Sequence, residues 1–375
     1  MATSIESAGN DAGRPVPWLF SRGVDLAAFG GSAVVSLALL AIGAQLGILD
    51  GDTPGWGWVA MILLVDVAHV YSTAFRVYFD LDEFRRRPAL YVGVPLAGLV
   101  ISWALYSEGE MLFWRVLAYL AVFHFVRQQY GWMALYRSRG GDGGGWSRWV
   151  DTAAIYLATV FPLVYWHAHL DSKAFEWFRD GDFVEVPGVL AELLEPVYWL
   201  TMAAYVLRSA LAYRAGRGSP GKDLLVVTTA VCWYVGIVTF DSDFAFTVTN
   251  VIIHGVPYVV LVFWTMQRRS VAGTGLRVSA SRRWVVLLAT IWLLAYVEEL
   301  AWHHSLGLSR GWLFGDSQEV GTQLAGYRDF LVPLLAVPQL THYVLDGFIW
   351  RRRANPGFRL VPEPVSSQVS DSDGA

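Results

Sequence analysis

Residues 244–267 read FAFTVTNVIIHGVPYVVLVFWTMQ, a run of 24 residues without a charged side chain. A helix needs about 20 predominantly apolar residues to cross the hydrocarbon core of a membrane, so this run is long enough to span it. It carries two polar side chains near its middle, Asn250 and His254. The run therefore predicts a transmembrane helix with a polar feature inside the membrane.

Nine other runs of this kind recur along the chain, which is 55% hydrophobic and only 16% charged. A soluble all-helical fold of this size needs much less apolar surface and is disfavoured. The sixth run is the weakest, because Glu192 and Glu195 precede Pro196, and we expect that it could begin as an interfacial helix. We predict an all-α, polytopic transmembrane bundle of ten spans, at residues 24–48, 56–79, 88–107, 111–136, 149–169, 188–212, 223–240, 244–267, 284–301 and 329–350.

The orientation of these spans follows from the distribution of basic residues, which are enriched in cytoplasmic loops. Basic residues precede the first run and follow every even-numbered run, whereas the other loops are acidic or poor in base. With ten spans, both termini are predicted to be cytoplasmic. The basic residues are Arg14, Arg22, Arg85, Arg86, Arg87, Arg137, Arg139, Arg148, Arg214, Arg217, Lys222, Arg268, Arg269, Arg277, Arg282, Arg283, Arg351, Arg352, Arg353 and Arg359.

The chain divides into one membrane domain and two tails. Residues 1–23 are polar, lack the apolar core of a secretory signal, and predict a cytoplasmic N-terminal tail. Residues 24–353 form the predicted bundle, in which the sequence GGDGGG at 140–145 predicts a flexible cytoplasmic linker. Residues 354–375 are rich in Ser, Pro and Asp and predict a disordered cytoplasmic tail.

Charge and cysteine content exclude several classes of function. A net charge of −4 with no basic domain argues against a nucleic-acid partner. Cys232 is the only cysteine, which excludes an internal disulfide, a CxxC site and a CxxCH haem attachment. A metal would have to be bound by histidine, carboxylate or tyrosine side chains.

Polar side chains inside the predicted spans are concentrated in four helices that run in the same direction. A charged group at mid-membrane costs roughly 2.5 to 3.5 kcal/mol on insertion scales, so such residues need a reason. A single histidine in a membrane helix is more often a packing residue, but four at similar depth favour a shared metal. Each of these four helices carries one central histidine: His69, His124, His254 and His342.

Four further polar residues lie three or four positions from the histidines, hence on the same helix faces. Asp66, Asn250 and Asp346 are predicted to orient the imidazoles from the second shell, since a metal-binding histidine usually donates its other N–H to such a group. Arg127 is predicted to neutralise Asp66 or Asp346.

The sequence around the remaining histidines gives weaker evidence for metal binding. Glu299 and His303 form an ExxxH pair near the outer end of the ninth run, where solvated charge is the favoured interpretation over metal binding. His167, His169 and His304 are interpreted as loop residues at or beyond the outer surface.

The segments HFVRQQYGW (124–132) and HYVLDGFIWR (342–351) look like signatures of an uncharacterised bacterial family of polytopic membrane proteins. The layout of single histidines on separate helices is also similar to that of the Brp/Blh-type carotene dioxygenases, and this likeness covers four positions only. The resemblance implies an intramembrane iron bound by His69, His124, His254 and His342, in a multi-pass protein of the bacterial cytoplasmic membrane. The histidine boxes of membrane desaturases are absent, which disfavours a di-iron desaturase.

Three functions remain open at this level. We favour a membrane metalloenzyme, a non-haem oxidoreductase with Fe(II) and an apolar lipid or isoprenoid substrate, because chemistry on a buried lipid tail more often needs oxygen activation than water. Zinc and copper also suit an all-histidine set. The alternatives are a single-haem b protein and a proton-coupled transporter in which the histidines, Asp66, Arg127 and Asp346 form a relay.

The distribution of arginine predicts the topology directly. Reporter fusions after Arg139, Arg217 and Arg283 should give a cytoplasmic signal, and fusions near Asp180 and Asp316 an external one. Because the sixth run is the weakest, fusions on either side of it are the most informative pair. A mixed or reversed pattern would contradict the ten-span topology.

Overall fold

The computed structural model describes residues 17–49, 53–140, 145–170, 181–240, 242–271, 279–306, 310–316 and 318–351. Within these ranges the regular structure is helical, without strands, as predicted. Most of the N-terminal tail, nearly all of the Gly-rich linker and the C-terminal tail lie outside the described residues, so their predicted roles stay predictions.

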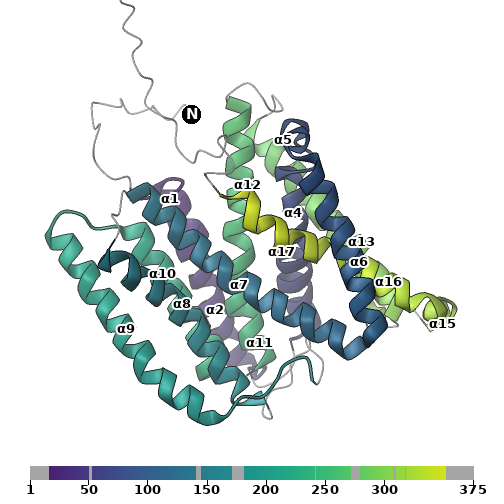
Figure 1. Cartoon of the computed structure of the whole chain (residues 1–375), viewed down its shortest axis with the longest axis horizontal. Coiled ribbons are helices and arrows are strands. Elements are labelled where there is room, and N and C mark those ends of the chain that lie inside the picture. The colour runs from purple at the N-terminus through teal and green to yellow at the C-terminus, as the bar shows by residue number, and fades with distance from the viewer. Residues whose placement is uncertain are drawn as a thin grey trace, which may run out of the picture.

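Figure 1 shows the arrangement of the helices in the described part of the chain. The first half comprises α1 (Arg22–Asp25), η1 (Leu26–Gly31), α2 (Ser32–Leu46), α3 (Gly55–Gly57), η2 (Trp58–Val67), α4 (Ala68–Arg76), α5 (Leu81–Arg86), α6 (Pro88–Glu108), α7 (Glu110–Gly140) and α8 (Trp146–His167). The second half comprises α9 (Gly188–Arg214), α10 (Pro220–Trp233), η4 (Tyr234–Thr239), α11 (Asp243–Phe246), η5 (Thr247–Val251), α12 (Ile252–Val271), α13 (Ala280–Leu306), α14 (Gly311–Phe314), α15 (Gln318–Leu324), η6 (Ala325–Tyr327), α16 (Arg328–Leu335) and α17 (Val337–Ile349).

Eight helices among the described residues are long and apolar enough to cross a membrane. They correspond to predicted spans one, two, three, five, six, seven, eight and nine, which supports a membrane protein. The sixth span is one continuous helix, α9, despite Pro196. The count of ten spans and the placement of the termini stay predictions.

The two predicted spans that do not qualify are those that carry His124 and His342. The fourth corresponds to α7, which has the length of a span but is too polar around its centre. The tenth is broken at Ala336 into α16 and α17. Pro338 lies in the first turn of α17, where a missing N–H is tolerated, and a proline there favours the end of the preceding helix.

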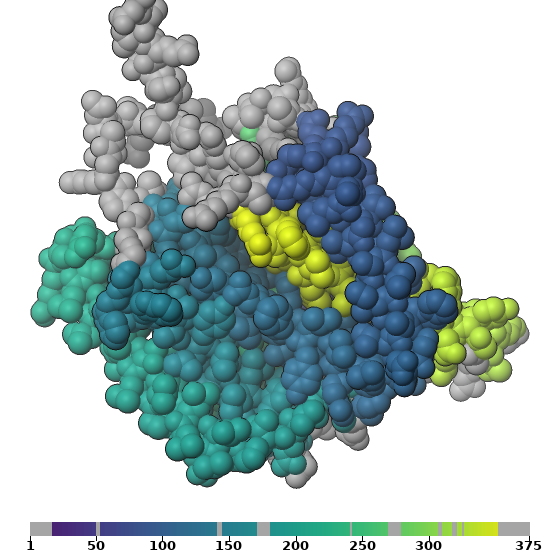
Figure 2. Space-filling model, viewed as in Figure 1, coloured from purple at the N-terminus to yellow at the C-terminus, as the bar shows by residue number. Residues whose placement is uncertain are grey.

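The short helix α17 lies against the long helices that surround the candidate site. It packs on α6, α4 and α7, and α4 in turn packs on α12 and α13. In the space-filling view α17 is visible between α6 and α7 (Figure 2). This arrangement brings α17, near the C-terminus, beside α4 and α7, which are distant from it in the sequence.

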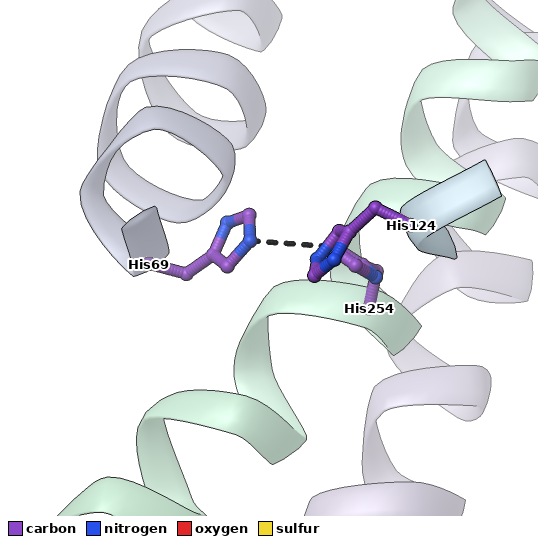
Figure 3. Close-up of side chains that lie close together, drawn as sticks. All are labelled: His69, His124 and His254. Carbon is purple, nitrogen blue, oxygen red and sulfur yellow. Dashed lines mark hydrogen bonds between the residues drawn. The ribbon is translucent and has the colours of Figure 1, made fainter. Parts of the chain in front are cut away.

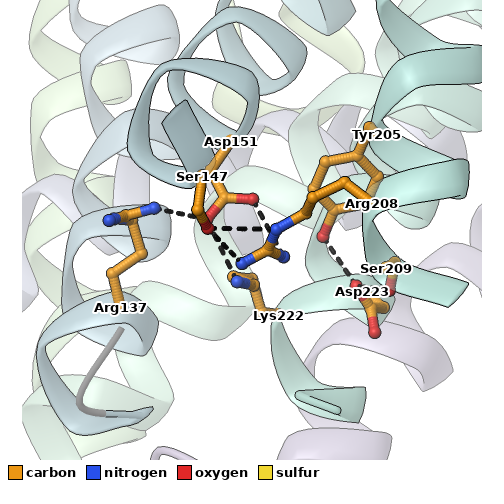
Figure 4. A network of polar contacts seen from close by, with 8 residues as sticks. All are labelled: Arg137, Ser147, Asp151, Tyr205, Arg208, Ser209, Lys222 and Asp223. Atoms are coloured by element: carbon orange, nitrogen blue, oxygen red, sulfur yellow. Dashed lines mark hydrogen bonds and ion pairs between the residues drawn. The ribbon is translucent and has the colours of Figure 1, made fainter. Parts of the chain in front are cut away.

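A buried ionic network holds four helix ends together (Figure 4). Asp151 of α8 is fully buried and accepts ion pairs from Arg137 of α7 at 2.5 Å, Lys222 of α10 at 3.0 Å and Arg208 of α9 at 3.2 Å. Removing one partner of a buried ion pair costs more than a surface pair contributes, because the remaining charge is desolvated. The sequence analysis interpreted Arg137 and Lys222 as cytoplasmic loop charges, whereas Lys222 is only 1% exposed.

We expect Asp151→Asn to destabilise the protein strongly, since the neutral amide cannot balance the buried charge of Lys222 and its neighbours. The expected loss is about 3–5 kcal/mol in the free energy of unfolding. It can be measured as a fall in the thermal midpoint of detergent-solubilised protein. Glu192→Gln, at an exposed position on α9, is the matched control. Equal, small shifts for both variants would contradict this role of Asp151.

Candidate metal centre

Four buried histidines from four different helices meet in the interior of the bundle. His69 comes from α4, His124 from α7, His254 from α12 and His342 from α17, and each side chain is between 1% and 4% exposed. Ring centroids of neighbouring members lie 4.6 to 5.2 Å apart. In Figure 3 His69 points from its helix toward His124 and His254. The sequence-based prediction that the four imidazoles converge is thus met by the fold.

The rings turn their Nε2 atoms toward one another in two pairs. The Nε2 atoms of His69 and His254 are 3.1 Å apart, and those of His124 and His342 are also 3.1 Å apart. Two nitrogens bound to one metal at about 2.0–2.1 Å lie about 2.8 to 3.4 Å apart for right-angled or tetrahedral geometry. Either a metal ion or an N–H···N hydrogen bond therefore satisfies each pair.

The Nδ1 atoms point outward, and three of them face a second polar group. His342 Nδ1 is 2.7 Å from the Thr73 hydroxyl oxygen, His69 Nδ1 is 3.7 Å from Asp66, and His124 Nδ1 is 4.0 Å from Asp346. Metal-binding histidines usually turn one ring nitrogen toward the metal and the other toward a polar group such as a carboxylate. The arrangement of these rings is of that kind.

The potential ligand atoms form two overlapping groups of three, within which all atoms lie within 4.8 Å of one another. One group is His69, His124 and His254, and the other is His124, His342 and Asp346. Asp346 is thus close enough to bind a metal directly, in addition to facing the Nδ1 atom of His124. Each group of three could hold a metal ion, and His124 belongs to both groups.

Local backbone features of the sequence position two of the histidines. The π-helices η2 and η5 end two and three residues before His69 and His254, respectively. π-Helical turns are wider than α-helical turns and change which side chains share a face, and they are frequent at functional sites. The four-residue spacing used in the sequence analysis could not anticipate them.

Gly255 permits the close approach of α12 to η2. A Cβ atom on Gly255 would lie 2.7 Å from Cγ1 of Val65 and 3.2 Å from its carbonyl oxygen, and 3.6 Å from Cβ of His69. The absent side chain therefore lets the two helices pack closely beside the pair of His69 and His254. On another side, Gln128 of α7 donates to the backbone oxygen of His254 at 2.8 Å.

Aromatic side chains surround the imidazoles. Phe125 lies with its ring centroid 3.9 Å from that of His254, Tyr343 stacks 4.7 Å from His124, and Tyr258 lies 5.0 Å from His342. The Tyr258 hydroxyl also contacts the Thr73 hydroxyl at 3.1 Å. The site is consequently enclosed by apolar ring faces with only a few polar atoms.

The structure corrects the predicted role of Arg127. Its guanidinium is exposed, donates to the Tyr156 hydroxyl and lies over the ring of Tyr130, so it neutralises neither Asp66 nor Asp346. The buried stripe of α7 follows His124, Gln128 and Trp132 at steps of four, which leaves Arg127 at its edge.

Asn250 and Asp346 also have partners other than those predicted. Asn250 lies in η5 and donates to the Phe246 carbonyl and the Thr249 hydroxyl instead of supporting the ring of His254. Asp346 faces His124 on another helix, while the partner of His342 is Thr73. Sequence reasoning missed Thr73 because a threonine in an apolar helix gives no signal of its own.

The remaining histidines, including His303 of the ExxxH pair, do not belong to the four-histidine centre. His303 is buried and its Nε2 is 3.0 Å from the Gly315 carbonyl oxygen, a structural contact. His167 ends α8 and is buried, and His304 lies within α13, so neither is the loop residue that was predicted. His169 follows α8 and is exposed, as predicted.

Comparison of this chain with protein-family models, with curated proteins and with solved structures gives no match. The proposed function below therefore depends on the geometry of the site and on the chemistry of its residues.

We expect Gly255→Ala to weaken metal binding while the protein stays folded, since the new methyl group must push α12 away from Val65 and so separate His254 from His69. Metal content after purification and affinity by titration are the measurements. Gly131→Ala on α7 is the control, because a Cβ there meets no atom within 4 Å. Equal metal content in both variants would show that the helix approach at Gly255 does not hold the site.

Proposed function

We propose that this protein is an intramembrane metalloprotein in which His69, His124, His254 and His342 hold one divalent metal, most simply Fe(II). We further propose that it is an oxidoreductase acting on an apolar lipid or isoprenoid substrate. The observation that carries the proposal is the convergence of four buried imidazoles with their Nε2 atoms turned inward in pairs 3.1 Å apart.

The charges around the site suit a divalent cation. Asp66 and Asp346 approach His69 and His124, and neither carboxylate forms an ion pair with Lys or Arg among the described residues. A pair of partly buried, uncompensated carboxylates is unfavourable, and one divalent cation bound to neutral imidazoles would balance both charges. A site without metal needs another source of positive charge or bound protons.

The donor set favours a transition metal over the hard cations. Imidazole nitrogens suit iron, copper, zinc and nickel, whereas Mg²⁺ and Ca²⁺ require oxygen ligands. Four nitrogen ligands leave open positions on a metal that accepts six, and when bound such an iron supplies oxygen activation. We prefer iron because the site lies within an apolar helix bundle, where hydrolysis would lack water.

The chain's own residues would orient the metal and exclude water. Thr73, Asp66 and Asp346 would each fix an imidazole through its Nδ1 atom. Phe125 and Tyr343 cover the site with ring faces that suit an unsaturated or branched hydrocarbon better than a polar substrate. Membrane lipids and an apolar small molecule are accordingly the proposed partners.

A haem b is less compatible with this geometry. Two axial histidines face each other across a porphyrin plane, which must fit between them. Here each histidine contacts neighbouring imidazoles at ring-centroid distances of 4.6 to 5.2 Å, which leaves no room for a porphyrin in this arrangement.

We expect that replacing any one of the four histidines by Ala removes most of the bound metal, because a four-ligand site loses both affinity and shape when one member is lost. The measurement is elemental analysis of the purified variants with an optical spectrum. Stoichiometric iron without a Soret band agrees with the proposal. Unchanged metal content in all four variants would refute it.

Substitution of the groups that face the outer ring nitrogens should reduce metal binding less than loss of a histidine. Asp66→Asn, Asp346→Asn and Thr73→Val should each weaken metal binding about 10-fold to 100-fold. His169→Ala, at the exposed end of α8, is the control and should retain full metal content. Complete loss in Asp346→Asn would assign this carboxylate as a direct ligand.

A further inference from the structure

Three carboxylates lie beside the histidine centre, toward one end of the bundle. Glu298 and Glu299 belong to α13, and Asp66 belongs to η2, one turn before His69. The charges of the three interact with one another. At 1.5 Å per residue, Glu298 and Glu299 lie about 10–12 Å before the end of α13 at Leu306. Arg282 and Arg283 lie at the opposite end of this helix.

The position of Glu298 is fixed by two hydrogen bonds. It accepts from the Tyr71 hydroxyl at 2.5 Å and from Trp302 Nε1 at 3.2 Å. Tyr71 is two residues from His69 on α4, so Glu298 is held against the same helix that presents the histidine. Glu299 is half-buried beside it and Glu298 is buried.

Asp66, one of the three carboxylates, faces the imidazole ring of His69. His69 is 2% exposed, and its Nδ1 atom has no hydrogen-bond partner among the described residues. Asp66 Oδ1 lies 3.7 Å away and also lacks a hydrogen bond. This separation is too long for a direct hydrogen bond. Both atoms are therefore left without a hydrogen bond beside the other two carboxylates.

The region carries an excess of negative charge. None of the three carboxylates forms an ion pair with Lys or Arg in the described part of the chain. The charge of Glu299 interacts with the positive charge of Arg310. The Arg310 guanidinium lies over the Trp58 ring, 4.3 Å from its centre. Three carboxylates against one guanidinium leave a net attraction for cations.

A cation bound for the histidine centre must lose its water shell inside an apolar bundle. Carboxylates placed along the route replace water ligands step by step, which lowers the cost of desolvation. Clefts lined by one sign of charge also raise the local concentration of the opposite ion and its rate of association. A buried metal site needs such a path in addition to its ligands.

We propose that Glu299, Glu298 and Asp66 form a loading path by which a divalent cation reaches the four histidines from the acidic end of α13. The path ends at Asp66, one turn before His69, whose inward Nε2 atom belongs to the proposed site. This inference rests on the proposed metal site, because it assigns the route by which that site is filled.

The test uses Co(II) as the probe and the full-length apo-protein in detergent, with loading followed by the visible absorption of bound Co(II). Glu298→Gln and Glu299→Gln should each slow loading about 10-fold, with the final absorbance unchanged. Glu299→Gln is half-buried and isosteric, so it serves if Glu298→Gln does not fold. Glu192→Gln on α9 is the control and should load at the wild-type rate.

Each other outcome overturns the proposal in a recognisable way. Unchanged loading rates in both variants would exclude the path. A lower final absorbance at an unchanged rate would assign the carboxylates to the binding site itself. Absence of Co(II) binding by the wild-type protein would refute the metal site, and with it the path, which distinguishes failure of the proposed function from failure of this inference.

Discussion

The burial of four imidazoles among apolar helices is the constraint on which the rest of the structure depends. Each ring has two nitrogens that water cannot reach, and a buried polar atom without a partner is costly. The fold pairs the Nε2 atoms with one another and His342 Nδ1 with the Thr73 hydroxyl, and it places Asp66 and Asp346 within 4.0 Å of two further Nδ1 atoms. Several irregular features of the helices lie beside this arrangement.

Three of these irregularities lie directly before segments that present a histidine. The π-turns of η2 and η5 precede His69 and His254, and the break at Ala336 precedes the helix that presents His342. Gly255 leaves the space that lets two of these helices pack closely. The two ends of the bundle differ in charge, since the network of Asp151 holds basic side chains whereas Glu298 and Glu299 lie at the end of α13 away from Arg282 and Arg283. A cation attracted to the acidic end would therefore meet the histidines from one side.

Much of this architecture was predictable from the sequence. Uncharged runs such as 244–267 predicted the long helices, and four single histidines in helices of like direction predicted that the imidazoles meet. Both signals are strong because a membrane excludes charge, so a polar residue inside a span stands out. The sequence also pointed to Asp66 as a neighbour of His69, and the structure places their atoms 3.7 Å apart.

The remaining partners could not be predicted, because they depend on contacts between helices. Periodicity along one helix assigned Asp346 to His342 and Asn250 to His254, whereas Asp346 faces His124 and Asn250 donates to the Phe246 carbonyl. Arg127 lies at the edge of the buried stripe of α7, a rotation of about one residue that spacing alone does not resolve. Thr73, Gly255 and Gln128 became visible only when the helices were placed side by side.

The most direct test of the central claim is X-ray absorption spectroscopy of the metal in the purified protein. A single metal per chain with a first shell of about four imidazole nitrogens at about 2.0–2.1 Å is the result that four converging histidines predict. Multiple-scattering features of the imidazole rings should weaken in His254→Ala. Absence of stoichiometric metal, or a first shell of oxygen or sulfur atoms, would contradict the account.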